Sequence, residues 1–310
     1  MIETGRKINV IETSCLTKHY KTVKAVQNVS INVKKGEIYG FLGLNGAGKT
    51  TTIRMLLGMI KPLSGEAWLL GKQIFPGGPG PWNKVGYLVE LPFSYPELTV
   101  RENLVAVSQL RRLKKKNAVP DIIRLLRLDA YVNVKARYLS HGNSQRLGLA
   151  KALIHQPEIL VLDEPSNGLD PAGIVEIRKL LKDYAENHGV TVFVSSHNLS
   201  EISKTATRIG IIHSGVLVQE IDTDKLDTLL HRYLLIDTRD RTGAAAILKD
   251  MGIDVTNSED GLLCITDPDT CKKPEQINTQ LVSKGYPPFF LKVQQEDLES
   301  YFLRIIGDIK

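Results

Sequence analysis

The pattern of hydrophobic and polar positions predicts alternating strands and helices along the first two thirds of the chain. In residues 24–34, "KAVQNVSINVK", apolar and polar side chains alternate, and after a Lys35-Gly36 turn the chain is apolar over residues 38–42. Alternation is typical of a half-buried strand, and an apolar run is typical of a buried parallel strand. Residues 49–59 then have helical spacing. This region therefore predicts a strand, a glycine-rich loop and a helix.

The middle of the chain predicts a helical insertion in an α/β sheet. Residues 61–74 return to turn and strand character, and "FPGGPGPW" at 75–82 is a loop that neither helix nor strand tolerates. Residues 99–128 predict helices, with Thr99 as N-cap and Glu102 as its capping-box partner. Three apolar strand segments separated by helices complete the α/β pattern at residues 157–165, 189–198 and 208–220.

The pattern changes after about Arg232. From there the segments predict the order β-α-β-β-α-β-α, which is typical of a ferredoxin-like fold. We therefore expect an α/β domain at residues 1–232, with a helical subdomain at about 92–155, and a small accessory α+β domain at 233–310. The sequence leaves open whether the accessory domain is regulatory, braces a dimer or packs on the core.

Composition adds little to this picture. The 310 residues, 42% hydrophobic and 24% charged, suffice for one large domain and a smaller one. Forty Lys and Arg against 34 Asp and Glu give a net charge of +6, which fits nucleotide phosphates or a membrane surface without choosing between them. The basic run at residues 111–116 has no interleaved aromatics and lies in a helix-like polar stretch, so we interpret it as a solvated face rather than a nucleic-acid contact.

The three cysteines, Cys15, Cys264 and Cys271, have neither an even count nor CxxC spacing. A disulfide framework or a zinc site is therefore not expected, and a reducing compartment is. Residues 1–14 lack the apolar core of a signal peptide, and no run of about 18 apolar residues could span a bilayer. We expect this chain to be soluble by itself.

Residues 43–50, "GLNGAGKT", match the G-x-x-x-x-G-K-[ST] phosphate-binding loop, with an apolar strand before and a helix after. Glycines let successive backbone N–H groups face a triphosphate, and the helix starting near Lys49 directs its positive dipole end at the same anion. We expect Lys49 to reach the β- and γ-phosphates and Thr50 to ligate Mg²⁺. A plain glycine turn is the alternative, and the context argues against it.

Two carboxylates end the apolar strand "ILVLDEP" at residues 159–165. This places Asp163 and Glu164 at the carboxyl edge of the sheet, where open α/β folds bind ligands. Asp163 is suited to the Mg²⁺ shell and Glu164 to orienting or deprotonating the attacking water. The alternative is that both acids cap the next helix.

The stretch "LSHGNSQRL" at residues 139–147 begins a second helix with an anion-binding character. Ser140, Gly142 and the first backbone amides of that helix form a second anion-binding site. The glycine loop at residues 43–50 is already such a site, and a single nucleotide does not need both. The alternative is a plain helix N-cap by Ser140 or Asn143.

Taken together, these motifs resemble the nucleotide-binding subunits of ABC transporters over residues 16–220. "LSHGNSQRL" resembles the family signature, usually LSGGQ, with His141 and Asn143 as departures and Ser140 and Gly142 retained. The resemblance implies a P-loop NTPase of ABC type that binds Mg and ATP. It also implies that two copies stack head to tail, with each ATP held between one P-loop and the opposite signature helix.

The resemblance assigns roles to further residues. His197, in "VSSHNLSE", resembles the histidine that contacts the γ-phosphate and the water, with a buried structural histidine as the alternative. Glu90 aligns with the Q-loop, where many members have glutamine, and can ligate Mg²⁺ with Thr50 and Asp163. Tyr20 resembles the aromatic that stacks on adenine, although it can also be a surface tyrosine. The full set expected to contact nucleotide is Tyr20, Gly43, Asn45, Gly46, Gly48, Lys49, Thr50, Thr51, Ser140, Gly142 and Asp170.

Longer stretches, among them "SYPELTVRENL" and "LDPAGIVEIRKLL", resemble the ATPases of ABC-2-type exporters of the bacitracin-resistance and lantibiotic-immunity kind. This implies separate transmembrane permease subunits and a cytoplasmic location, peripheral on the inner membrane face through the permease.

The competing class is a soluble ABC ATPase that acts on ribosomes or DNA, but this chain has neither a second ATPase module nor long heptads. A module that holds nucleotide without turnover would be expected to lack Glu164 or His197, and both are present. The cargo and the choice between homodimer and heterodimer stay open.

Overall fold

The computed structural model describes residues 8–90, 92–258 and 260–307, and the chain forms two compact units, Met1–Asp224 and Lys225–Lys310. Part of the stretch used to argue against a signal peptide, residues 1–7, lies outside the described residues.

A six-stranded sheet forms the centre of the first unit. Its strand order is β10-β9-β3-β8-β7-β6, with β10 antiparallel to β9 and every other neighbouring pair parallel. All residues of β3, β7 and β8 are buried, as expected for parallel strands covered on both faces. The strands are β3 (Ile38–Leu42), β6 (Val85–Leu88), β7 (Ile159–Asp163), β8 (Thr191–Ser196), β9 (Arg208–His213) and β10 (Val216–Asp222).

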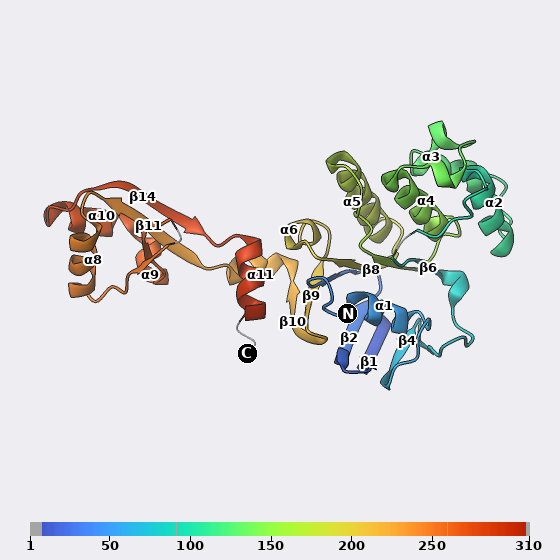
Figure 1. Cartoon of the computed structure of the whole chain (residues 1–310), viewed down its shortest axis with the longest axis horizontal. Helices are drawn as coiled ribbons and strands as arrows, with labels where there is room; N and C mark the ends of the chain where they lie inside the picture. Colours follow the sequence, from blue (N-terminus) through green and yellow to red (C-terminus); the bar gives the residue numbers. More distant parts are fainter. Residues whose placement is uncertain (1–7, 91, 259, 308–310) are drawn as a thin grey trace, which may run out of the picture. The chain divides into compact units, whose positions relative to one another are not determined.

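A smaller antiparallel sheet, ordered β2-β1-β4-β5, packs with helix α1 (Lys49–Leu56) against one face of the large sheet (Figure 1). Side chains from both sheets and α1 form one hydrophobic core. Strand β1 was missed by the sequence pattern, because a bulge with Cys15 at φ 49° interrupts its alternation. The strands are β1 (Asn9–Tyr20), β2 (Val23–Lys34), β4 (Ser64–Leu69) and β5 (Lys72–Gln73).

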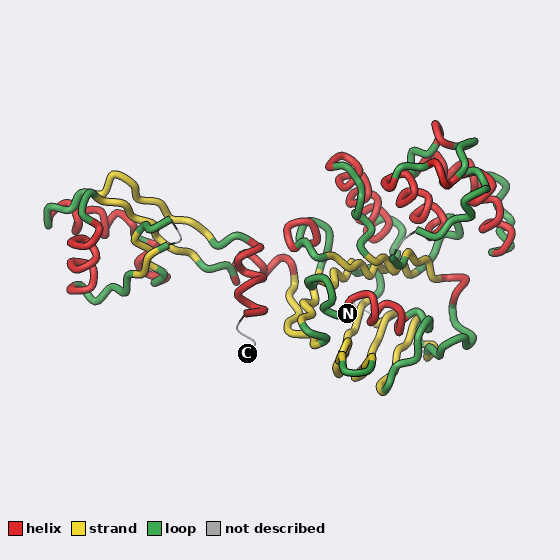
Figure 2. The backbone as a smooth tube through the Cα atoms, in the orientation of Figure 1, coloured by secondary structure: helices red, strands yellow, loops and turns green. Residues whose placement is uncertain are grey.

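Helices cover the opposite face of the large sheet, which is seen edge-on in Figure 2. The capping box predicted at Thr99 and Glu102 is confirmed: the Glu102 amide donates to Thr99 Oγ1 at 3.2 Å, and the Thr99 amide donates to Glu102 Oε2 at 2.8 Å. The basic run is not helical as expected, because α2 ends at Leu110 and residues 111–117 are turn and loop. The helices in contact with the sheet are α4 (His141–Leu153), α5 (Pro171–Glu186) and α6 (Leu199–Ile202), whereas α2 (Val100–Leu110) and α3 (Ala118–Leu125) pack on α4. Turns of 3₁₀ helix lie at Trp82–Lys84, Asp129–Tyr131, Ala136–Tyr138 and Thr223–Lys225.

The second unit has the predicted ferredoxin-like topology. Its four strands are ordered β12-β13-β11-β14, and every neighbouring pair is antiparallel. The hydrophobic core of this unit lies between the sheet and helices α8, α9 and α10. The elements are α7 (Leu226–Leu229), β11 (Arg232–Thr238), α8 (Arg241–Asp250), β12 (Thr256–Asn257), β13 (Leu263–Ile265), α9 (Pro268–Lys272), α10 (Pro274–Ser283), β14 (Pro288–Gln295) and α11 (Leu298–Gly307).

The two ends of the second unit are bonded to each other. The His231 amide donates to Glu296 Oε2 at 3.0 Å, and the Glu296 amide donates to the His231 carbonyl at 2.7 Å. Arg304 of α11 holds the Glu296 carboxylate at 2.8 and 2.9 Å and lowers its pKa. These contacts explain why residues 225–231 group with the second unit, so that the division falls before the boundary expected at residue 232.

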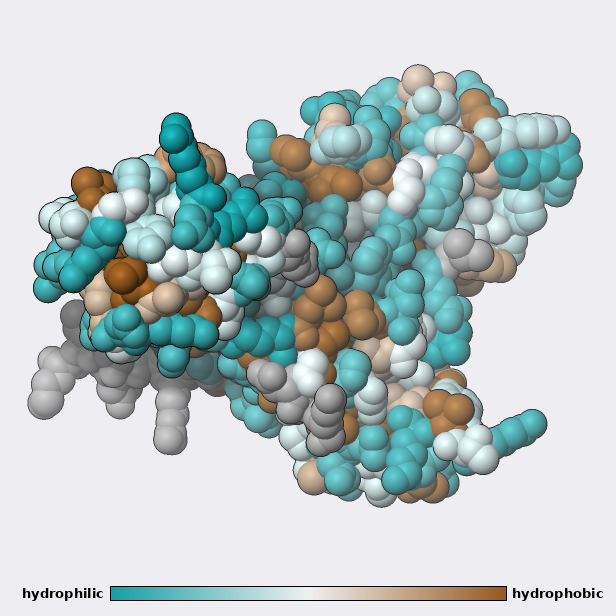
Figure 3. Space-filling model, turned by 60° about the vertical axis from the view of Figure 1, so that its left-hand side comes forward, coloured by the Kyte–Doolittle hydropathy of each residue, from teal (hydrophilic) through white to brown (hydrophobic). Residues whose placement is uncertain are grey.

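None of the helices in the part of the chain that the structure describes combines the length and apolar character needed to cross a bilayer. The face seen in Figure 3 is mostly hydrophilic, with apolar side chains in separate small groups.

Candidate functional site

The loop between β3 and α1 is shaped by its glycines. Gly46 and Gly48 have φ of 81° and 109°, and a Cβ on Gly48 would lie 2.4 Å from the Ala25 carbonyl oxygen. A Cβ on Gly43 would lie 2.5 Å from the Ile212 carbonyl oxygen. Side chains are therefore excluded for steric reasons at the positions where the backbone turns into α1, and the first helical amides are left available for an anion.

Lys49, the first residue of α1, is 6% exposed and lies against its own loop. Its Nζ donates to the Gly43 carbonyl at 2.5 Å and to the Leu44 carbonyl at 3.3 Å. It also lies 3.2 Å from Glu164 Oε1. Among the residues that the structure describes, none donates a hydrogen bond to that oxygen, and its contact with Lys49 is an ion pair. A buried ammonium requires such partners, and phosphate oxygens can take their place.

Thr50 and Asp163 come together as the sequence predicted. Thr50 Oγ1 donates to Asp163 Oδ2 at 2.7 Å, and Ser195 Oγ of β8 donates to Asp163 Oδ1 at 2.5 Å. Ser195 is fully buried, and its Oγ also accepts from the Glu164 amide at 3.0 Å. One hydroxyl therefore fixes both acids at the end of β7.

Glu164 adopts a left-handed backbone, with φ of 50°, which is a strained conformation for a residue other than glycine. Its Oε2 lies 2.8 Å from Nδ1 of His197. The His197 ring is half exposed, which excludes the alternative of a buried structural histidine. The next helix, α5, is capped by Asp170 and not by Asp163 or Glu164, so the alternative of two capping acids is also excluded.

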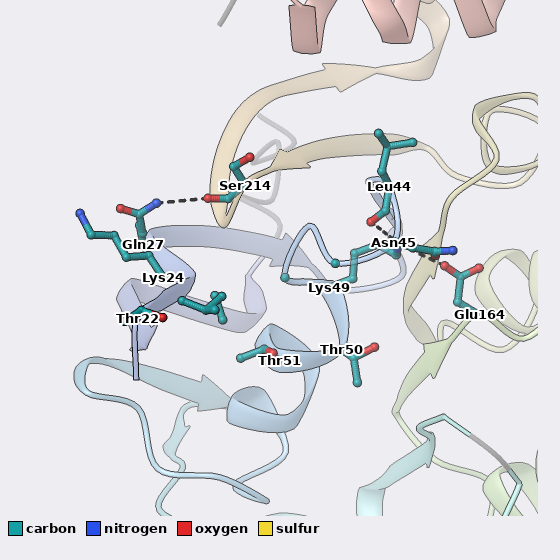
Figure 4. Close-up of a pocket in the computed structure, with 14 residues that line it drawn as sticks. Thr22, Lys24, Gln27, Leu44, Asn45, Lys49, Thr50, Thr51, Glu164 and Ser214 are labelled. Atoms are coloured by element: carbon teal, nitrogen blue, oxygen red, sulfur yellow. Dashed lines mark hydrogen bonds and ion pairs between the residues drawn. The ribbon is translucent and has the colours of Figure 1, made fainter. Parts of the chain in front are cut away.

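A cavity of about 670 Å³ opens over these groups (Figure 4). Seven of its lining residues belong to the predicted site: Asn45, Gly46, Gly48, Lys49, Thr50, Thr51 and Glu164. The opposite wall comes from the start of β2 and from Ser214, whose carbonyl accepts from Gln27 at 3.1 Å. The sequence pattern did not predict this second wall, which is formed by Thr22, Val23, Lys24, Ala25, Gln27 and Ser214. Leu44, which also lines the cavity, belongs to the glycine loop.

Gly43, Asp163 and His197 contact residues that line the cavity without lining it themselves, and two further predicted residues lie away from it. Tyr20, at the end of β1, is 44% exposed and has the Lys18 ammonium 5.4 Å from its ring centre. Glu90 pairs with Arg54 at 2.5 Å and lines a separate groove of about 400 Å³ between β6 and the helices α2 and α4. The stacking role of Tyr20 and the metal role of Glu90 stay predictions.

The signature residues also lie outside the cavity. Ser140 is the N-cap of α4, and its hydroxyl accepts from the Asn143 amide at 3.3 Å. Gly142 faces the loop at residues 166–170, since a Cβ there would be 3.0 Å from the Gly168 carbonyl oxygen. Asp170 caps α5 by accepting from the Gly173 amide at 3.0 Å. In one copy of the chain these residues therefore make structural contacts, and their phosphate roles stay predictions.

Sequence reasoning missed two polar residues that organise the site. Ser195 carries a faint signal, because it is a polar residue at the end of a fully buried strand. Gln145 of α4 is 2% exposed and donates to the carbonyls of Glu164 and Pro165 at 3.3 and 3.2 Å. The sequence around Gln145 does not indicate this role, since glutamine is common on helices. Only the folded structure shows its contact with Glu164 and Pro165.

Comparisons with known proteins agree with this geometry. An ABC transporter family model matches residues 26–167. The bacitracin transport ATP-binding protein BcrA of Bacillus licheniformis is 40% identical over 301 residues, which cover 96% of this chain and 97% of that protein. The lantibiotic transport ATP-binding protein SrtF of Streptococcus pyogenes is 32% identical over 232 residues, covering 72% of this chain and 97% of that protein.

Solved structures show the same architecture. The ATP-binding subunit of an ABC transporter superposes with a TM-score of 0.64 at 26% identity, covering 71% of this chain and 91% of that one. A bacterial ABC transporter cassette solved as a dimer gives a TM-score of 0.62 at 27% identity, covering 69% of this chain and 98% of that one.

A glycine loop between a parallel strand and a helix, facing acids on a nearby strand, defines a P-loop nucleotide hydrolase. With the similarity to BcrA, the chain belongs to the ATP-binding subunits of the ABC transporter family. It is an ATPase that drives transport. The similarity also extends through the second unit, beyond the residues 16–220 inferred from motifs.

The first prediction concerns Glu164. Glu164→Gln should keep ATP binding and lower kcat by about 10²- to 10⁴-fold, because it removes the carboxylate expected to accept a proton from water. Lys49→Ala, the matched control, should instead weaken ATP binding by about a hundredfold through the lost charged contacts. Calorimetric binding and steady-state phosphate release separate the two effects. Normal hydrolysis by Glu164→Gln would overturn this assignment.

The second prediction concerns Ser195. Ser195→Ala leaves the Glu164 amide unpaired and frees Asp163 Oδ1, so kcat should fall by about ten- to a hundredfold with a smaller change in KM for ATP. Ser195→Thr should retain part of the activity. The control is Ser196→Ala, whose hydroxyl accepts from the Asn198 amide instead. An unchanged kcat in Ser195→Ala would show that these hydrogen bonds do not position the acids.

Proposed function

We propose that this chain is the ATP-driven motor of an exporter in which two copies close head to tail on two Mg·ATP and act on separate permease subunits. One observation carries the proposal: Ser140 and Gly142 begin a 13-residue helix, yet they do not line the nucleotide cavity of their own chain. The N-terminus of this helix is a second anion-binding site, and it has a ligand if it contacts the nucleotide bound to a second copy of the chain. The relatives named for bacitracin and lantibiotic transport suggest a peptide antibiotic as cargo.

The residues present fit Mg²⁺. Thr50 and Asp163 supply a hydroxyl and a carboxylate, the hard oxygen donors that this ion prefers. No group of three or more His, Cys, Asp or Glu in the described ranges forms a metal cage. That is consistent with an ion held by one or two protein ligands together with phosphates and water. When bound, Mg²⁺ would neutralise phosphate charge.

The remaining chemistry belongs to the side chains of the site. Lys49 would exchange the Gly43 and Leu44 carbonyls for phosphate oxygens and release Glu164 Oε1. That oxygen is buried and accepts no hydrogen bond, so it can accept one from the attacking water. His197, bonded to Oε2, would hold the carboxylate in this orientation.

The groove that contains Glu90 is suited to a permease segment. Met59, Tyr87, Phe93 and Leu110 give it apolar walls. Lys151 donates to the Phe93 carbonyl and Arg111 to the Trp82 and Val85 carbonyls. Burial lowers the pKa of both cations, and neither has a carboxylate partner within the described ranges. A short amphipathic helix carrying an acidic side chain would complement this groove.

The dimer is tested by the solution mass of Glu164→Gln. We expect a doubled mass with Mg·ATP and a monomer with Mg·ADP or without nucleotide, because only the γ-phosphate would be held by the opposite helix. Adding Lys49→Ala should abolish the dimer. A monomer under all conditions would overturn the homodimer.

The permease contact is tested by co-purification from native membranes. Lys151→Glu should lose a multi-spanning partner, since it places an acid where the partner is expected to bring one. Lys179→Glu on the exposed side of α5 is the control and should retain it. Recovery of ribosomes or DNA in place of a membrane protein would favour the soluble class of ABC ATPase.

A further inference from the structure

His141, the departure from the family signature, packs on the loop that follows Glu164. A Cβ added to Gly168 would lie 1.7 Å from Cδ2 of the His141 ring and 2.6 Å from its Nε2. Contacts this short do not occur between real atoms, so the imidazole occupies the space that any side chain at position 168 would need. Gly168 also has φ of 75°, which suits glycine.

This contact belongs to a larger interface along one side of α4. Gln145, four residues after His141 and so on the same helix face, donates to the Glu164 and Pro165 carbonyls. Gly142 approaches the Gly168 carbonyl. The first turns of the signature helix therefore hold the chain from Glu164 to Gly168 of the same copy.

The loop itself is closed by its own backbone. The Asn167 amide donates to the Glu164 carbonyl at 3.1 Å, and the Leu169 amide donates to the Ser166 carbonyl at 3.2 Å. Asp170 then caps α5. Gln145 fixes the beginning of this loop and the α5 cap fixes its end, which leaves the ring of His141 as a side-chain support at its tip.

We propose that His141 is a positioning residue for the loop at residues 166–170, and that His141 and Gly168 form a matched pair in which the ring requires the glycine. The inference rests on the proposed function, since Ser140, Gly142 and Asp170 are the residues expected to face the second copy. A displaced tip would disturb the contact between Gly142 and Gly168 beside Ser140. His141 therefore supports closure of the dimer on nucleotide and does not impair the signature.

A double-mutant cycle in the Glu164→Gln background tests the pair, with His141→Ala, Gly168→Ala and both changes together. We measure the dimerisation constant with Mg·ATP. Gly168→Ala should weaken the dimer strongly while the ring is present. In the His141→Ala background, Gly168→Ala should weaken the dimer only through the strain of a left-handed backbone. Its effect on the dimerisation constant should therefore be about tenfold smaller. Should Gly168→Ala not fold, Gly168→Asn serves, because asparagine tolerates left-handed backbone.

Two further readouts separate positioning from simple packing. With Glu164 intact, His141→Ala should lower kcat at saturating ATP, while ATP binding to the monomer changes little, because the cavity of the same chain does not include residue 141. Asn143→Ala, the other departure from the signature, is the matched control. If the His141 and Gly168 substitutions are coupled in the thermal unfolding midpoint but not in the dimerisation constant, the positioning role is refuted.

The outcomes for the inference and for the proposed function are distinct. If the parent Glu164→Gln dimerises with ATP and the two substitutions act additively, the matched pair is refuted and the homodimer stands. If the parent never dimerises, the homodimer falls, and with it the closure that His141 is proposed to support.

Discussion

A buried ammonium group is the constraint around which the nucleotide site is arranged. Lys49 is almost fully buried, so its positive charge must always have partners. In this structure the partners are the Gly43 and Leu44 carbonyls and the Glu164 carboxylate. In the function proposed above, phosphate oxygens take the place of these partners, and the release of Glu164 is linked to that exchange.

The sheet order explains why the acids meet the loop at all. Strand β8 lies between β3, which carries the loop, and β7, which ends in Asp163. A side chain at the end of β8 is therefore placed to reach the neighbouring strand, and Ser195 bonds both Asp163 and Glu164. The left-handed turn at Glu164 is then supported from the next strand and from Gln145 of α4. Strain in the backbone is tolerated where surrounding contacts determine it.

Local patterns predicted a large part of this molecule. The apolar run before the glycine loop and the capping box at Thr99 were confirmed, because each depends on neighbours in the sequence. The predicted succession of strands and helices in the second unit was confirmed apart from α9, a short helix that the pattern did not predict. Strand β1 was missed because a bulge breaks its alternation. The second cavity wall and Gln145 depend on contacts between segments far apart in the chain, which spacing cannot show. The match of His141 to Gly168 is of the same kind, since neither residue predicts the other until both are placed.

The closed ends of the second unit have a mechanical consequence. The segment that enters the unit at Leu229 and His231 is bonded directly to Glu296 and to Arg304 of the final helix. A force applied at the entry point is therefore borne both by β11, an interior strand of the sheet, and by α11. A chain truncated before α11 would keep the two bonds between His231 and Glu296, but it would lose the Arg304 guanidinium that joins the Leu229 carbonyl to the Glu296 carboxylate.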